Sequence, residues 1–233
     1  MTTIDLSAKT ANKPSVGVLK NITCYLDFIS PYAYLAFELL PEALREVSYS
    51  LSYQPVLFGA MLKHHNQLGP AEIEPKRDWT YRQVLWLAHS RGVPLKMPAS
   101  HPFNPLPLLR LALASSPAAE PAAPNRYVCE TIFRHVWRGG DDAVDPARLH
   151  ALAQAVSPSR AVNSDEVKAQ LKRNTDEAIG LGVFGVPTFV VDDKLFWGLD
   201  SLPMLRAYLQ GDAWFDGADW QAGANVRVGI RRQ

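Results

Sequence analysis

A strand-forming run that ends abruptly at a serine-proline turn constrains this chain more than any other feature. Residues 22–28 are apolar and aromatic enough for a buried strand. Ser30 and Pro31 end the run, and apolar residues recur at helical spacing from Leu35 onward. Pro31 suits the first turn of a helix, where a missing N–H loses no hydrogen bond. The pattern predicts a strand, a turn at Ser30 and a helix.

A second strand is predicted after this helix. The helical spacing continues to Val47, although Pro41 is expected to kink the helix. Residues 49–57 then have strand character. A strand, a helix and another strand in succession favour two parallel strands of one sheet.

The middle of the chain is predicted to be helical. Apolar faces at helical spacing occupy three segments, residues 81–88, 128–136 and 149–156. A fourth helix is expected to begin at Asn163, because Glu166 three residues later completes a capping-box pattern. Proline-rich connections lie between these helices, at residues 97–107 and 117–124.

Strand character returns towards the C-terminus. Residues 188–191 and 195–197 are predicted strands joined by a turn, and residues 201–209 are a predicted helix. No element is clear beyond Gly211. The two outer parts, βαβ and ββα, are expected to form one sheet, because neither has enough strands to be stable alone.

Composition restricts the class of protein. With 233 residues, 47% of them apolar, the chain can bury the core of one domain, with or without an insertion. The net charge is +1 and no basic stripe stands out, so neither nucleic acid nor an anionic membrane is an expected partner. No stretch is apolar enough to span a bilayer, and no secretory signal is expected at the N-terminus.

The cysteines and histidines do not have the spacing of a metal site, so none is expected. Cys24 falls in the first predicted strand and Cys129 in a predicted helix. The sequence alone leaves a disulfide between them open, but two reduced packing residues are the preferred interpretation.

Two interpretations of Ser30 follow from its position. Free backbone N–H groups and the dipole at a helix N-terminus stabilise negative charge. They would stabilise a thiolate brought by a ligand, with the Ser30 hydroxyl donating to its sulfur. In the simpler interpretation Ser30 only caps its helix, which is worth ~1 kcal/mol. No Gly-x-Ser-x-Gly elbow surrounds Ser30, so it is not expected to be a nucleophile itself.

Val186-Pro187 opens the third predicted strand. A proline in this place, opposite an active-site turn, is often cis, and the backbone beside it can pair with an extended peptide ligand. The alternative is an ordinary trans proline at a strand start. The position of this pair, after a βαβ unit and before a ββα unit, favours the first interpretation.

Three motifs resemble those of one family. Residues 27–36 (DFISPYAYLA) match the pattern DF-x-SP-x-x-YLA, and residues 183–188 (VFGVPT) and 196–200 (FWGLD) match two more. The chain resembles the 2-hydroxychromene-2-carboxylate isomerases and the kappa-class glutathione transferases, within the DsbA-like thioredoxin superfamily. The resemblance extends over about residues 22–209. It implies an α/β, thioredoxin-like fold (βαβ…ββα) with a large all-helical insertion.

The resemblance also implies how the chain is divided. The thioredoxin-like domain would comprise residues 21–58 and 183–212, with the helical insertion at 59–182, a flexible leader at 1–20 and a tail at 213–233. A redox member would carry Cys-x-x-Cys at the turn, where this chain has Ser30 and Ala33. Thiol-disulfide exchange is therefore disfavoured.

A glutathione site around Ser30 is implied by the resemblance. Ser30 would hold and activate the sulfur of glutathione, and Val186, beside a cis Pro187, would offer its backbone to the cysteinyl part. Trp197, Gly198 and Asp200 would grip the γ-glutamyl end, with Asp200 suited to its ammonium group, and Leu199 would offer a backbone contact. An aromatic carboxylate substrate is expected to contact Lys63, Lys76, Arg77 and Asn104.

Simpler interpretations of these residues stay open. Lys63 can belong to a solvated surface, Trp197 to the core, and Asp200 can cap the last helix. The chain also departs from the family pattern. The family usually has a polar residue in place of Leu199 and an arginine in place of Ser201, and these differences would weaken glutathione binding.

The leading hypothesis is a glutathione-dependent isomerase of a small aromatic or unsaturated keto-acid, an enzyme of aromatic catabolism. Glutathione would add to a conjugated carbon and leave again without being consumed. The first alternative is a kappa-like transferase that conjugates glutathione to electrophiles, and the second is a non-catalytic binding module. The expected form is a cytoplasmic homodimer with glutathione as cofactor.

Overall fold

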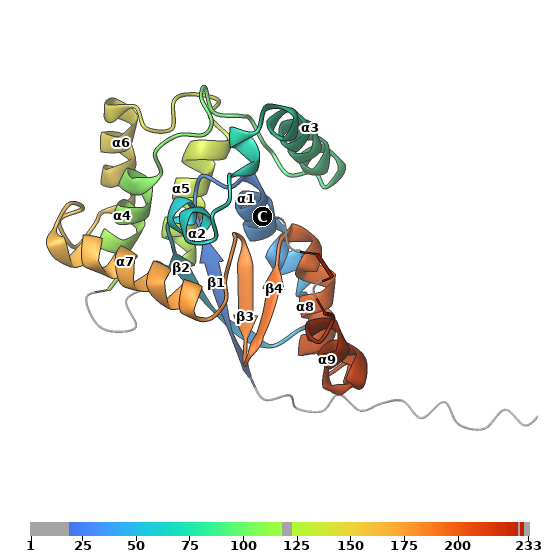
Figure 1. The fold of residues 1–233 in the computed structure, drawn as a ribbon. Helices are drawn as coiled ribbons and strands as arrows, with labels where there is room; N and C mark the ends of the chain where they lie inside the picture. Colours follow the sequence, from blue (N-terminus) through green and yellow to red (C-terminus); the bar gives the residue numbers. More distant parts are fainter. Residues whose placement is uncertain (1–18, 118–122, 228, 231–233) are drawn as a thin grey trace, which may run out of the picture.

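A four-stranded mixed sheet forms the centre of the protein. The computed structural model describes residues 19–117, 123–227 and 229–230 (Figure 1). The strands are β1 (Lys20–Leu26), β2 (Tyr49–Pro55), β3 (Thr188–Val191) and β4 (Lys194–Trp197), in the order β2-β1-β3-β4. β1 pairs parallel with β2 and antiparallel with β3, and β3 pairs antiparallel with β4. The expectation that the two outer parts share one sheet is confirmed.

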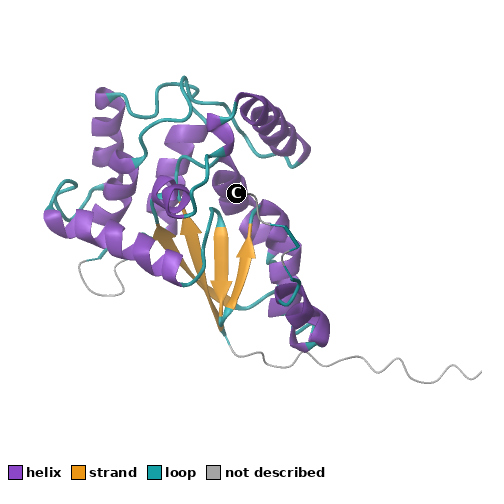
Figure 2. Ribbon diagram, in the orientation of Figure 1, coloured by secondary structure: helices purple, strands orange, loops and turns teal. Residues whose placement is uncertain are grey.

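Helices surround this sheet (Figure 2). They are α1 (Pro31–Ala43), α2 (Phe58–His64), α3 (Glu74–Ser90), α4 (Leu106–Ala114), α5 (Arg126–Trp137), α6 (Pro146–Val156), α7 (Asp165–Gly180), α8 (Leu202–Leu209) and α9 (Ala218–Ala224). Three short 3₁₀ helices, at Pro70–Glu72, Leu199–Ser201 and Ala213–Asp216, complete the described elements. Helices α4 and α6 lie beyond the β2 edge of the sheet, and α8 lies beyond the β4 edge (Figure 1). Helix α7 begins at the β2 side, and its C-terminal part packs against the face of the sheet that carries Tyr25.

Alternation along β1 separates two hydrophobic cores, because successive side chains of a strand point to opposite faces of the sheet. Ile22, Cys24 and Leu26 belong to the larger core, which α1 and α5 share. Tyr25 belongs to a smaller core with Met61 of α2 and other buried residues. The strand is therefore covered on both faces, as its apolar sequence predicts.

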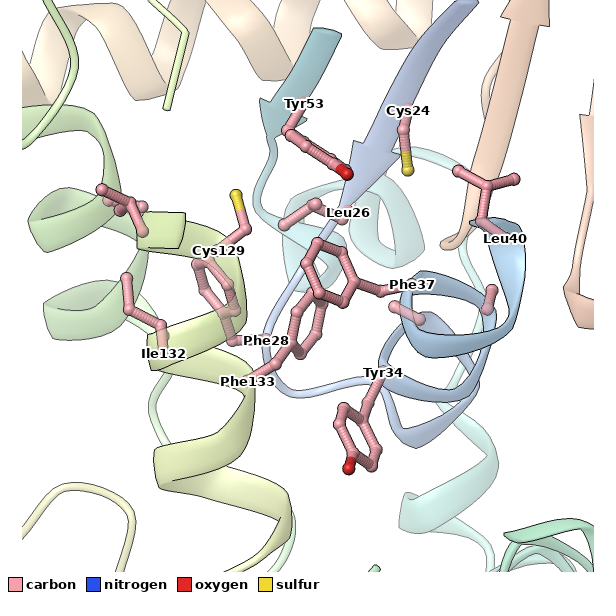
Figure 3. Close-up of a cluster of buried hydrophobic side chains, with 14 of the residues drawn as sticks. Cys24, Leu26, Phe28, Tyr34, Phe37, Leu40, Tyr53, Cys129, Ile132 and Phe133 are labelled. Atoms are coloured by element: carbon pink, nitrogen blue, oxygen red, sulfur yellow. The ribbon is translucent and has the colours of Figure 1, made fainter. Parts of the chain in front are cut away.

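Aromatic side chains join the start of α1 to the helical part of the chain (Figure 3). The Phe133 ring of α5 lies 4.8 Å from that of Phe28 and 5.2 Å from that of Phe37, measured between ring centroids. All three side chains are buried, and each contributes ~1.5–3 kcal/mol by leaving water. This packing anchors both sides of the turn that carries Ser30.

The two cysteines lie in the larger core as free thiols, which confirms the preferred interpretation. Burial raises the pKa of the Cys24 thiol to about 12 and also raises the pKa of Cys129. Neither sulfur therefore ionises near neutral pH. Thiolate chemistry on this chain's own cysteines is disfavoured for the same reason.

Several local predictions were wrong or incomplete. Helix α7 is capped by Ser164, whose hydroxyl accepts from the Val167 N–H at 3.3 Å, and not by Asn163. The sequence analysis missed α4, because its run of leucine and alanine is buried on nearly every side and shows no polar face. It also missed the short helices α2 and α9. Beyond Gly211, Phe215 and Trp220 pack against Phe196 of β4.

The division into a thioredoxin-like domain and an insertion stays a prediction. The predicted leader lies almost wholly outside the described residues, as does part of the proline-rich connection at 117–124. Within the described ranges, no helix combines the length and apolar character that crossing a membrane requires.

Candidate functional site

Ser30 caps α1 and also reaches across to the third strand. It has the extended backbone of an N-cap residue, and its hydroxyl oxygen accepts from the Ala33 N–H at 3.2 Å. The same hydroxyl donates to the backbone carbonyl of Val186 at 3.3 Å. The predicted N-cap is confirmed, and the hydroxyl joins the two segments that the sequence analysis singled out.

The Val186-Pro187 peptide bond is cis, as the first interpretation expected. Thr188 fixes the preceding loop, because its hydroxyl donates to the carbonyl of Gly185 at 2.7 Å. The Pro187 carbonyl accepts from the N–H of Gly198 at 2.9 Å. The Val186 N–H makes no hydrogen bond with any residue that the structure describes, so this backbone donor is available to a ligand.

Gly198 forms a turn that only glycine adopts readily. Its φ is +92°, and a Cβ at this position would lie 2.4 Å from Oδ1 of Asp200. The Ser201 hydroxyl donates to the Gly198 carbonyl at 2.8 Å and stabilises the turn. Asp200 is exposed, and among the described residues it has no ion-pair partner. The turn therefore presents an uncompensated carboxylate.

Trp197 forms part of the wall of the site. Its side chain is 54% exposed, so it is not a core residue, and its ring lies 4.8 Å from that of Phe184. A Cβ on Gly185 would lie 2.7 Å from Nε1 of Trp197. The indole thus occupies space that any larger residue at position 185 would need.

A groove of about 770 Å³ runs between α1, α3 and the start of α8. Five residues of the expected glutathione site line it: Val186, Trp197, Gly198, Leu199 and Asp200. Tyr32 of α1 and Gln83 of α3 lie opposite them, and the Tyr32 hydroxyl donates to Oε1 of Gln83 at 2.6 Å. Burial raises the pKa of Tyr32, so its phenol stays protonated near neutral pH.

The four expected substrate residues do not line this groove. Lys63 is exposed on α2, while Lys76 and Arg77 lie in the first turn of α3. Asn104 accepts from the Leu106 N–H at 3.1 Å, at the start of α4. It also lines a separate hollow of about 380 Å³ with Arg110 and other residues. A substrate role for these four residues stays a prediction.

Sequence reasoning missed two titratable groups that hold the segment before Ser30, the buried Asp27 and the half-buried His101. The carboxylate of Asp27 accepts from the N–H groups of Ile29 at 3.1 Å and Phe58 at 3.0 Å. Burial raises its pKa from 3.8 to about 7. His101 bonds the Ile29 carbonyl through Nε2 at 2.8 Å, and burial lowers its pKa. A carboxylate at the end of a buried strand was a readable signal for Asp27, whereas nothing in the sequence signalled His101.

Comparison with known proteins shows the same family that the motifs suggested. A family model described as a DSBA-like thioredoxin domain matches residues 21–210. A 2-hydroxychromene-2-carboxylate isomerase of Sphingobium xenophagum is 29% identical over 197 residues, covering 82% of this chain and 98% of the relative. Glutathione S-transferase kappa 1 of Rattus norvegicus is 25% identical over 207 residues, covering 82% of this chain and 90% of the relative.

Among solved structures, a 2-hydroxychromene-2-carboxylate isomerase aligns with a TM-score of 0.71 at 24% identity. The alignment covers 86% of this chain and 98% of the other. The thioredoxin-like fold expected from the sequence is therefore confirmed. Because the family model spans most of the sequence, from the first strand to the end of α8, the chain belongs to the family of DSBA-like thioredoxin domains.

Proposed function

We propose that this protein is a glutathione-dependent isomerase of a small aromatic or unsaturated keto-acid. The observation that carries the proposal is the position of the Ser30 hydroxyl. It lies at the N-terminus of α1, within hydrogen-bond distance of the Val186 carbonyl, at a turn where a redox relative would carry cysteine. The site thus offers stabilisation for a thiolate but no sulfur of its own.

Three features of the groove fit glutathione. The unpartnered Val186 N–H and its neighbouring carbonyl suit an extended peptide, which pairs through its own backbone. The exposed carboxylate of Asp200 suits an α-ammonium group. The missing Cβ of Gly198 leaves room for that carboxylate at the wall of the groove. Leu199 would contact glutathione only through its backbone, because its side chain is apolar, and this is the weakest part of the proposed site.

Bound glutathione would supply a nucleophilic thiolate that adds reversibly to a conjugated carbon and so permits rotation about a former double bond. Ser30 would stabilise this thiolate by turning its hydroxyl from the Val186 carbonyl to the sulfur. The dipole at the N-terminus of α1 would add to that stabilisation. Tyr32, protonated and on the groove wall, would donate a hydrogen bond to a substrate oxygen by turning its hydroxyl away from Gln83.

A kappa-like transferase is the second candidate. Leu39, Leu87 and Leu202 also line the groove, and these apolar side chains suit an electrophile that leaves with glutathione attached. The two functions share the thiol site and differ in the fate of glutathione. The expected cytoplasmic location rests on the interpretation of the two cysteines as reduced packing residues, and the expected homodimer rests on the resemblance.

The decisive experiment follows glutathione through many turnovers. A solution of the protein, an o-hydroxybenzylidene keto-acid and catalytic glutathione is monitored for isomer interconversion by absorbance and for free thiol by a colorimetric assay. An isomerase converts substrate in large excess over glutathione with the thiol unchanged. Loss of one thiol for each substrate molecule identifies a transferase, and no reaction together with no glutathione binding contradicts both.

A further inference from the structure

Ile29, just before Ser30, is held by side chains at both its N–H and its carbonyl. Its N–H donates to Oδ1 of the buried Asp27 at 3.1 Å, and its carbonyl bonds Nε2 of the half-buried His101 at 2.8 Å. The next carbonyl upstream, on Phe28, accepts from Nε1 of Trp137 at 3.0 Å. Three side chains from separate parts of the sequence therefore immobilise the turn.

The partners of His101 fix its protonation. Because a carbonyl oxygen only accepts hydrogen bonds, Nε2 must carry the hydrogen that points to Ile29. Nδ1 lies 2.8 Å from the Tyr81 hydroxyl, which donates its hydrogen to the His101 carbonyl at 2.8 Å. Burial lowers the pKa of His101 and so favours the neutral ring, in which Nδ1 carries no hydrogen. The Ile29 carbonyl thereby selects the tautomer, and the Tyr81 hydroxyl contacts both the ring and the backbone of His101.

Tyr81 connects this arrangement to α3. It lies four residues after Arg77, so the two side chains share a face of the helix, and Arg77 and Asp78 are the charged groups that act on Tyr81. Arg77 is one of the residues expected to meet a substrate carboxylate. A chain of hydrogen bonds thus leads from that face of α3, through Tyr81 and His101, to the peptide beside Ser30.

We propose that His101 is a positioning residue for the Ser30 site, and that Tyr81 holds His101 in place. His101 keeps the Ile29 carbonyl fixed, and this keeps the Ser30 hydroxyl and the start of α1 in position. The inference deepens the proposed function, because the group to be aimed at is the glutathione sulfur. Loss of His101 then weakens thiolate stabilisation more than it weakens glutathione binding, since most of the groove is untouched.

A matched pair of variants tests this role. His135 resembles His101, because Nε2 also bonds a backbone carbonyl, that of Ala143 at 2.9 Å, and burial also lowers its pKa. It lies at the end of α5, outside the groove lining. His101→Leu and His135→Leu are compared for unfolding midpoint, glutathione affinity, kcat and the pKa of the bound thiol, read from the ultraviolet absorbance of the thiolate.

The positioning role predicts that only His101→Leu raises the bound thiol pKa, by about one unit, and lowers kcat ~10-fold with glutathione affinity within ~3-fold. His101→Gln should recover most of the loss, because its amide N–H can reach the Ile29 carbonyl. Equal thiol pKa and equal kcat in His101→Leu and His135→Leu would overturn the proposal. If His101→Leu fails to fold, Tyr81→Phe carries the test: a raised thiol pKa supports the role, and an unchanged one overturns it.

The role can also be read without glutathione. Amide hydrogen exchange at Ala33, whose N–H donates to Ser30, should be faster in His101→Leu than in His135→Leu relative to the parent protein. Absence of glutathione binding in the parent protein, with this exchange difference present, would refute the proposed function and keep the positioning role. Glutathione binding without the exchange difference would refute the positioning role and leave the proposed function standing.

Discussion

The hydroxyl of Ser30 donates to the carbonyl of Val186 at 3.3 Å, although 156 residues separate them in the sequence. Ser30 is the N-cap of α1, and Val186, which precedes the third strand, lines the groove. The hydroxyl has an alternative use, because its hydrogen can rotate towards a ligand atom placed between the two segments. Ser30 can therefore be tested as a hydrogen-bond donor to a thiolate and not only as a helix cap.

Replacement of Ser30 separates its two roles. Ser30→Ala should raise the pKa of bound glutathione by roughly one to two units and reduce kcat/KM about 10- to 100-fold, because a hydrogen bond to a charged sulfur is lost. It should also cost ~1 kcal/mol of unfolding free energy as a lost cap. Ser164→Ala, which removes the equivalent cap of α7, is the control. Equal activity in Ser30→Ala and Ser164→Ala would show that Ser30 only caps its helix.

Gly198 should be needed for ligand binding beyond its backbone conformation. Gly198→Ala places a Cβ 2.4 Å from Oδ1 of Asp200 at a φ of +92°, so the carboxylate must move. Glutathione affinity should fall about 10-fold. Gly92→Ala has a similar positive φ of +64° but an open environment, so it should cost only ~1 kcal/mol of stability and leave binding unchanged. If Gly198→Ala and Gly92→Ala bind glutathione equally well, Asp200 does not contact the ligand.

Asp200 should act on the ammonium group of the ligand. Because the carboxylate is exposed, Asp200→Asn should weaken glutathione binding only about two- to fivefold, and less at high salt. A glutathione analogue without the amino group provides the control in a calorimetric double-mutant cycle. The parent protein and Asp200→Asn should bind this analogue with equal affinity. If the affinity difference between them is as large as with glutathione, Asp200 does not contact the ammonium group.

Asp27 should make stability depend on pH in a defined direction. Its pKa is raised from 3.8 to about 7 in the folded protein, so between these values the native state holds more protons than the unfolded state. Stability should therefore fall as the pH rises through this window, by up to about 4 kcal/mol from this group. Urea unfolding from about pH 4 to pH 8 should show a flatter profile for Asp27→Asn. Parallel profiles would mean that Asp27 ionises normally.

Local patterns were enough to predict the sheet and the turn at Ser30. The apolar run around Tyr25, the proline after Ser30 and the Val186-Pro187 pair each carry a short-range physical signal, and the structure brings them together as expected. Prediction failed where burial is nearly complete, as in α4, because a helix without a polar face gives no periodic signal. The Ser164 cap was missed because Asn163 beside it offered the same capping chemistry.

The support behind Ser30 could not be predicted for a different reason. His101 and Ile29 are 72 residues apart, and their hydrogen bond depends on how the segment between α3 and α4 crosses the turn. A lone histidine in a proline-rich segment carries no sign of its partner. The positions of the expected substrate residues were also unpredictable from local sequence. The structure places Lys63 in α2, Arg77 in α3 and Asn104 just before α4.

Calorimetry with glutathione tests the central claim most directly. The account holds that Ser30 and the start of α1 stabilise a thiolate that the protein borrows from its ligand. It predicts binding at sub-millimolar glutathione, with proton release near neutral pH that Ser30→Ala abolishes or moves to higher pH. An absence of binding at millimolar glutathione, or binding with the same proton release in Ser30→Ala, would contradict it.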